Sequence, residues 1–191
     1  MVKLLIADGI SEQGGTSAWR QIVRKIKEDL CFVSLDVAAD KAKAAESTEI
    51  TKPYELPDGQ IVNINAARFM GPEGIFNPEV ITEGSEAEGM HKLAYKSNET
   101  CDIDIRSDLM ANVILSGGST LYEGLPDRLE KELDAMMPKR DQVKIIASAD
   151  RYYSVWTGGS TLVSLSTFES QWITKEEYEE NGSEIVHRKC V

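Results

Sequence analysis

The sequence predicts an α/β fold, because segments with a helix pattern alternate with segments with a strand pattern. Residues 20–30 carry apolar side chains three and four positions apart, which is the spacing of one helix face. Residues 111–115 form an apolar strand pattern that leads into a glycine-containing turn and then into another helix pattern. Residues 143–147 are a further run of the buried-strand type.

The length and charge of the chain exclude several classes of function. A chain of 191 residues can bury a core in one or two small domains. Its net charge of -11 argues against binding to nucleic acid or to an anionic membrane, since both need clustered Lys and Arg. The sequence contains no apolar run of about 18 residues, so we expect no membrane span. Its three cysteines are widely spaced, which predicts free thiols in a reducing cytoplasm and no zinc site.

In the first half of the chain, the clearest local signal is a hairpin. Residues 54–64 alternate around Asp58-Gly59, a pair that suits the positive φ angles of a tight reversal. Residues 1–8 are expected to form a helix or a strand, residues 9–17 a loop, and residues 31–36 a strand.

In the second half, helix signals dominate. Residues 82–89 are acidic and contain glycine, which predicts a solvated loop. Leucines recur every four positions from 125 to 133, which predicts a helix with one buried face. Thr174 and Glu177 form a capping box that predicts the start of a short helix.

The first candidate site is the turn after the strand pattern at 111–115. Gly117, Gly118 and Ser119 could let a ligand approach the backbone, whose N–H groups can face a phosphate or a ribose. The segment lacks both the GK[ST] of a P-loop and the GxGxxG of a dinucleotide site. Without other information, a tight strand-to-helix turn is the better interpretation.

A second candidate is the polar face of the helix at 20–30. Arg24, Lys27 and Glu28 lie three and four positions apart and therefore project together. Two cations beside a carboxylate could hold a ribose or the edge of a nucleobase. The alternative, which the residues alone favour, is a solvated face with an Arg24–Glu28 ion pair.

The third candidate is the aromatic segment 151–156, which includes Tyr152. Its rings could stack on a base, although aromatic segments more often pack in a core. His91 has no visible partner and is interpreted as structural. No Ser–His–Asp or Cys–His set can be assembled from the sequence.

Several motifs along the chain closely resemble actin in order and spacing. They are YELPDG at 54–59, CDIDIR at 101–106, SGG at 116–118, SVW and GGS within 154–160, LSTF at 165–168, WITKEEY at 172–178 and IVHRKC at 185–190. The resemblance covers residues 20–191 strongly and implies the actin-like, ribonuclease-H-like fold, in which two lobes close on ATP or ADP and a divalent cation, Mg or Ca.

The resemblance also implies a nucleotide site. It places Arg24, Lys27 and Glu28 beside the adenosine part of the nucleotide. It places Gly117, Gly118, Ser119, Leu121 and Tyr122 in the wall of the nucleotide cleft. Tyr152 stands where actins usually have a Lys, and stacking could replace the contact that this Lys makes.

The resemblance implies that the chain is the C-terminal half only of an actin. Residues 1–84 would be the remainder of a small outer lobe (subdomain 4-like) and residues 85–153 part of the large inner lobe (subdomain 3-like). Residues 154–191 would be C-terminal helices that return to the subdomain 1-like region. Since actin's phosphate hairpins, metal-side carboxylates and water-positioning groups lie upstream, we expect no ATP hydrolysis by these residues alone.

Two functions remain open from the resemblance. The first is a polymerising, ATP-binding subunit of the cytoskeleton in the cytoplasm, with other actin subunits as partners and actin-binding proteins in a groove near residues 159–171. The second is a non-catalytic actin-related protein that acts as an interaction module. The polar, acidic loop 80–89, Tyr152 and Gln171 favour the second, whereas the intact motifs at 172–178 and 185–190 favour the first.

Overall fold

The computed structural model describes residues 1–8, 17–138 and 142–190. Its α-helices are α1 (Val2–Ala7), α2 (Ser17–Leu30), α3 (Val37–Glu46), α4 (Ala67–Glu73), α5 (Met90–Glu99), α6 (Ile103–Met110), α7 (Leu125–Met136), α8 (Ser154–Val163), α9 (Lys175–Asn181) and α10 (Val186–Lys189). Its strands are β1 (Lys52–Glu55), β2 (Ile61–Ile64), β3 (Val113–Ile114) and β4 (Ile145–Ile146). Short 3-10 helices are η1 (Pro78–Val80), η2 (Gly118–Leu121), η3 (Ser166–Gln171) and η4 (Gly182–Ile185). The mixed helix-and-sheet class is as predicted.

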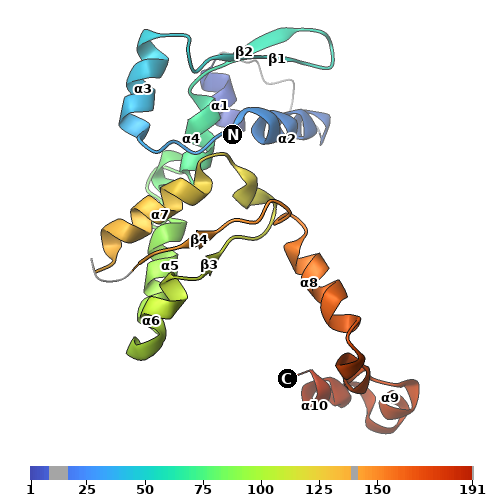
Figure 1. Cartoon of the computed structure of the whole chain (residues 1–191). Coiled ribbons are helices and arrows are strands. Elements are labelled where there is room, and N and C mark those ends of the chain that lie inside the picture. Colours follow the sequence, from blue (N-terminus) through green and yellow to red (C-terminus); the bar gives the residue numbers. More distant parts are fainter. Residues whose placement is uncertain (9–16, 139–141, 191) are drawn as a thin grey trace.

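The upper part of the molecule in Figure 1 contains α1 to α4 and the β1–β2 hairpin. The hairpin is antiparallel with Tyr54 opposite Val62, and Gly59 takes a φ of 83° in its turn, as the Asp58-Gly59 signal predicted. A first hydrophobic cluster fills this part, built from Leu5, Trp19, Val23, Ile26, Leu56, Val62, Ile64 and Ala67. We call these elements and their cluster the upper unit.

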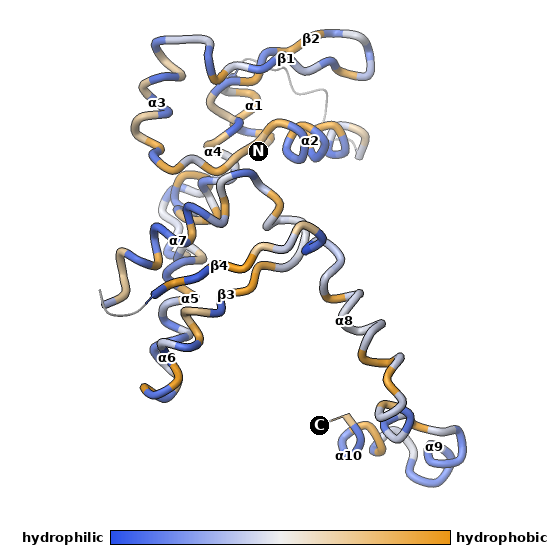
Figure 2. The backbone as a smooth tube through the Cα atoms, in the orientation of Figure 1, coloured by the Kyte–Doolittle hydropathy of each residue, from blue (hydrophilic) through white to orange (hydrophobic). Residues whose placement is uncertain are grey.

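Below it, α5, α6 and α7 lie beside the short parallel pair β3–β4 (Figure 1). Both strands are coloured hydrophobic in Figure 2, and Val113 pairs with Ile145. Helix α7 packs on α5 and β4. A second cluster fills this part, built from Val33, Phe76, Met110, Leu115, Leu125, Leu129, Leu133 and Val143. We call these elements and their cluster the lower unit.

The C-terminal helices form an arm that leaves the two units along α8 (Figure 1). No residue of α8 is buried. Gly158 and Gly159 lie inside this helix and not at a turn. At the far end, Thr174 and Glu177 make the predicted capping box of α9.

Two expectations from the sequence are wrong. Residues 31–36 form no strand, and only Phe32 makes a single bridge, to Glu123. The reason is that neighbouring backbone groups bond elsewhere: the Phe32 N–H donates to the Arg68 carbonyl, and the Ser34 carbonyl accepts from Arg128. The aromatic segment 151–156 does not pack in a core, since Trp156 is 73% exposed. The expected loop at 9–17 lies outside the described residues, except for Ser17, which begins α2.

Other local expectations are confirmed, although the strands expected at 111–115 and 143–147 are only two residues long each, β3 and β4. Residues 1–8 resolve as the helix α1, and α2 and α7 occupy the segments whose apolar spacing predicted helices. In the predicted solvated loop 82–89, residues 82–84, 86 and 87 are exposed, whereas Gly89 is buried. Among the described residues, no helix has the length and apolar character needed to cross a membrane.

Candidate functional site

A cavity of about 660 Å³ opens between α2 of the upper unit and the loop that follows β3 in the lower unit. Cavities that hold small molecules in proteins span roughly 300–1,000 Å³. The lining side chains are Arg24, Lys27, Glu28, Asp29, Cys31, Gly118, Ser119, Leu121, Tyr122, Glu123 and Tyr152. The cavity therefore has one charged, helical wall and one loop wall with two tyrosines.

The charged wall follows from the amphipathic pattern of α2. The helix buries Trp19, Val23 and Ile26 in the upper cluster, which turns the opposite face toward the cavity. On that face, the Nε of Arg24 donates to Glu28 Oε1 at 2.9 Å. This hydrogen bond raises the pKa of Arg24 and lowers the pKa of Glu28, so the pair stays ionised.

Lys27 is the second cation of this wall. It makes no hydrogen bond or ion pair with the residues that the structure describes, unlike Arg24. Because an ammonium carries three donors and Lys27 lines the cavity, its donors are available to a ligand there.

The loop wall takes its shape from two glycines. Gly117 has a φ of 90°, which L side chains rarely adopt, and its N–H donates to the Arg151 carbonyl at 2.9 Å. A Cβ on Gly118 would lie 2.9 Å from the ring of Tyr152, so the ring rests directly on this glycine. Arg151 completes the anchor, since its Nη2 donates to the Thr120 carbonyl at 3.0 Å. The loop and Tyr152 are therefore one packed surface.

Two groups at the back of the cavity keep their protons. Burial, followed by the nearby Cys31 and Glu28, raises the pKa of Tyr122 to about 12. Burial also raises the pKa of Cys31 to about 11, although Arg68 and Lys27 act in the opposite direction. At neutral pH, Tyr122 is thus a hydroxyl donor, and Cys31 is an unreactive thiol.

The structure brings together nearly all the residues that the sequence singled out for a site. Gly117 is the exception, because it shapes the turn but does not line the cavity. Sequence reasoning missed Asp29, Cys31 and Glu123. Cys31 lies four positions after Lys27, so helical spacing could have found it, whereas Glu123 carries no local signal.

A comparison with protein families decides the relationship of this chain. The family model described as Actin matches residues 7–191. The chain belongs to the actin family. Its membership implies the actin-like fold, as the motifs in the sequence predicted.

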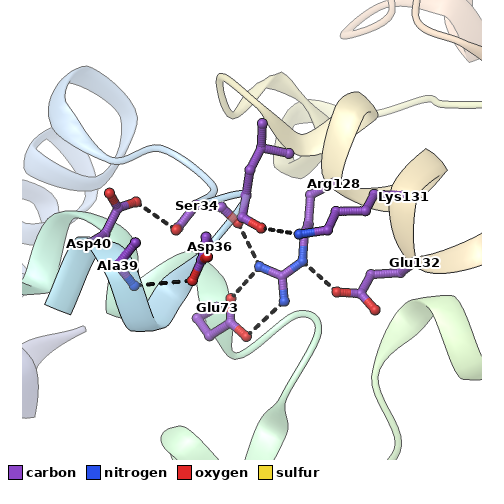
Figure 3. A network of polar contacts seen from close by, with 9 residues as sticks. Ser34, Asp36, Ala39, Asp40, Glu73, Arg128, Lys131 and Glu132 are labelled. Carbon is purple, nitrogen blue, oxygen red and sulfur yellow. Dashed lines mark hydrogen bonds and ion pairs between the residues drawn. The ribbon is translucent and has the colours of Figure 1, made fainter. Parts of the chain in front are cut away.

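This actin-family chain also has a buried polar network around Arg128 of α7 (Figure 3). Its Nη1 and Nη2 donate to the two carboxylate oxygens of Glu73 at 3.0 and 3.2 Å. Its Nε donates to Glu132 at 2.7 Å, and Nη1 also donates to the Ser34 carbonyl. Burial lowers the pKa of Arg128, but the hydrogen bonds to Glu132 and Glu73 outweigh it, so the net shift is upward. No motif in the sequence predicted this network.

Within residues 1–8, 17–138 and 142–190, no group of three or more His, Cys, Asp or Glu side chains could hold a metal ion.

Proposed function

We propose that this actin-family chain binds the adenosine end of ATP or ADP in the cavity between α2 and the loop after β3. The observation that carries the proposal is the convergence of Lys27, Glu28 and Tyr152 on one cavity, lined by a glycine at 118. Glu28 and Lys27 suit the hydroxyls of a ribose and the edge of a base, and the Tyr152 ring offers a stacking face. Tyr122 adds a neutral hydroxyl donor.

The charge of the cavity favours the nucleoside part of the ligand over its phosphates. Its lining has two cations, Arg24 and Lys27, against three anions, Glu28, Asp29 and Glu123, which gives a net charge of 2 − 3 = −1. A triphosphate would be repelled by such a wall, whereas a neutral nucleoside would not. The phosphates and the divalent cation bound to them would then lie outside this cavity, and the cation would offset the phosphate charge.

The test is binding of a fluorescent etheno-ATP with Mg²⁺ to the chain and to two variants of α2. Lys27→Ala removes a cavity donor, and loss of a hydrogen bond from a charged group should weaken binding by about tenfold. Lys25→Ala is the matched control, because it removes the same charge from the exposed face next to the cavity. Equal affinities of all three proteins would contradict the proposal.

A second set of variants tests the stacking face. Tyr152 lines the cavity, whereas the adjacent Tyr153 is 63% exposed and does not. Tyr152→Ala should weaken binding by at least about fivefold, since base–aromatic stacking is worth roughly 1–3 kcal/mol. Tyr152→Phe should retain affinity, and Tyr153→Ala should change it little. A loss of affinity with Tyr153→Ala of the same size would refute stacking at Tyr152.

We also propose the wider context that the motifs imply. The chain would be the C-terminal half of an ATP-binding, filament-forming actin subunit of the cytoskeleton, with the lobe boundaries near residues 84 and 153. Actin-binding proteins would contact the groove near residues 159–171. The exposed apolar side chains of Leu162, Val163 and Leu165 support a protein contact on this arm.

The alternative is a non-catalytic actin-related protein that works as an interaction module. It is favoured by the exposed acidic side chains of Glu83 and Glu86 in the loop before α5. A sedimentation assay separates the two functions: a filament subunit pellets above a critical concentration with ATP and Mg²⁺, and an interaction module stays in the supernatant.

A further inference from the structure

Two separate hydrophobic units carry the two walls of the cavity. The charged wall belongs to α2, whose inner face is part of the upper cluster. The loop wall precedes α7, whose leucines belong to the lower cluster. The width of the cavity therefore depends on whatever fixes the upper unit against the lower one.

The segment after α2 contacts the loop before α7 at the cavity residue Glu123. The Val33 N–H donates to the Glu123 carbonyl at 2.8 Å, and Phe32 bridges the same residue. Gly124 permits this approach, because it has a φ of 78° and a Cβ there would lie 2.5 Å from the Val33 carbonyl oxygen. The segment that leaves α2 thus runs directly against the loop that leads into α7.

Arg128 is the side chain that closes this junction (Figure 3). One guanidinium contacts the segment after α2 through the Ser34 carbonyl and the end of α4 through Glu73. The side chains of Arg128 and Glu73 are only 11% and 6% exposed. Ser34 lies three residues after the cavity residue Cys31, and Arg128 lies five residues after the cavity residue Glu123. Arg128 is therefore linked to both cavity walls through short stretches of chain.

We propose that Arg128 is a positioning residue that sets the spacing of the two cavity walls, and hence the lifetime of a bound nucleotide, without touching the ligand. A guanidinium suits this role because its planar fork bonds Glu73 through two nitrogens while Nε bonds Glu132. A lysine has one nitrogen and cannot hold this geometry, although it keeps the charge. The inference rests on the proposed nucleotide site for its ligand, but the wall spacing can be measured without ligand.

The first arm of the test measures the wall spacing. Spin labels at Lys25→Cys on α2 and Asp134→Cys on α7 report the distance between the units, in a chain whose Cys101 and Cys190 are replaced by Ser. Both label positions are exposed and lie outside the cavity lining. We expect Arg128→Lys and Glu73→Gln to broaden the distance distribution.

The second arm measures how fast etheno-ATP leaves. Arg128→Lys should raise the dissociation rate between about twofold and thirtyfold, the range expected for residues that couple sites. Leu133→Ala is the control for general destabilisation, since Leu133 is fully buried in the lower cluster and its apolar side chain makes none of the hydrogen bonds of the junction. It should lower the melting temperature but leave both the label distances and the dissociation rate unchanged.

The outcomes are separable. A wild-type chain that binds no etheno-ATP refutes the proposed function. In that case the label distances alone test whether Arg128 sets the spacing of the two walls. An unchanged distance distribution in Arg128→Lys, or an equal broadening in Leu133→Ala, overturns the positioning role. The last check is a conservative variant. Glu73→Asp keeps the negative charge and should therefore broaden the distribution of label distances less than Glu73→Gln does.

Discussion

His91 is a buried histidine whose surroundings disfavour a positive charge. Its side chain stacks on the ring of Phe76, with ring centroids 5.8 Å apart, and its Nδ1 has no hydrogen-bond partner among the described residues. Burial, and then the positive charges of Lys92 and Arg128, lower its pKa, whereas Glu132 and Glu73 oppose this shift. The structural role expected from the sequence agrees with these contacts.

This environment predicts a pH-dependent stability. Because the pKa of His91 is lower in the folded state, the unfolded chain binds the proton first as pH falls below about 6.5. The free energy of unfolding should then fall by up to about 1.4 kcal/mol per pH unit until the folded-state pKa is reached.

His91→Phe should remove this pH-dependent component of stability, and His187→Gln, at an exposed position, should keep it. Denaturant unfolding at pH 5 and pH 8 measures it, and an equal pH dependence in wild type and His91→Phe would contradict the assignment.

Among the elements, α8 is a helix that its own sequence disfavours. Gly158 and Gly159 lie in its middle, and a Cβ at either position would meet nothing within 4 Å. Glycine in a helix interior costs roughly 0.5–1 kcal/mol relative to alanine. With no buried residue to compensate, α8 should open more readily than α7, whose leucines are fully buried.

Alanine substitutions should therefore stabilise α8. Gly158→Ala and Gly159→Ala should each slow amide hydrogen exchange in this helix about twofold to fivefold, because alanine has a higher helix propensity than glycine. Gly124→Ala is the opposing control, because its Cβ would lie 2.5 Å from a backbone oxygen and its φ is positive. It should lower the melting temperature. Faster exchange in Gly158→Ala would show that the glycine serves a bend in α8.

At the scale of the whole molecule, the acidic loop before α5 bears on filament assembly, because a contact between subunits there would bury its carboxylates. Residues 81–84 are exposed, and Glu88 is already paired with Lys96 at 2.6 Å. Glu83 and Glu86 are the exposed carboxylates, and burying an unpaired carboxylate between subunits costs several kcal/mol. If the protein forms filaments, this loop should weaken them.

Replacing these side chains tests that expectation. A Thr82→Val, Glu83→Leu, Glu86→Leu variant should lower the critical concentration in a sedimentation assay, because the desolvation cost is removed and apolar area is gained. Glu88 is retained so that its bond to Lys96 stays intact. As a control, Glu130→Leu removes one carboxylate from α7, outside the loop. An unchanged or higher critical concentration of the loop variant would show that the loop does not limit assembly.

Much of the local structure was predictable because its signals are local. The apolar spacing of α2 and α7, the Asp58-Gly59 reversal and the Thr174–Glu177 cap each act within a few residues. The sequence motifs also established membership of the actin family, which the match over residues 7–191 confirms. The strand expected at 31–36 failed for a nonlocal reason, since α4 and α7 supply its hydrogen-bond partners.

By itself, the sequence determined the family, the main helices, the hairpin and the residue types available for a site. Only the tertiary structure decided that Lys27 and Tyr152 line one cavity, that Trp156 is exposed, and that Arg128 is buried against Glu73 and Ser34. The last two partners lie 55 and 94 residues from Arg128 along the chain. A charge can be buried only where its partners meet it in space, and no pattern in a short segment records that meeting.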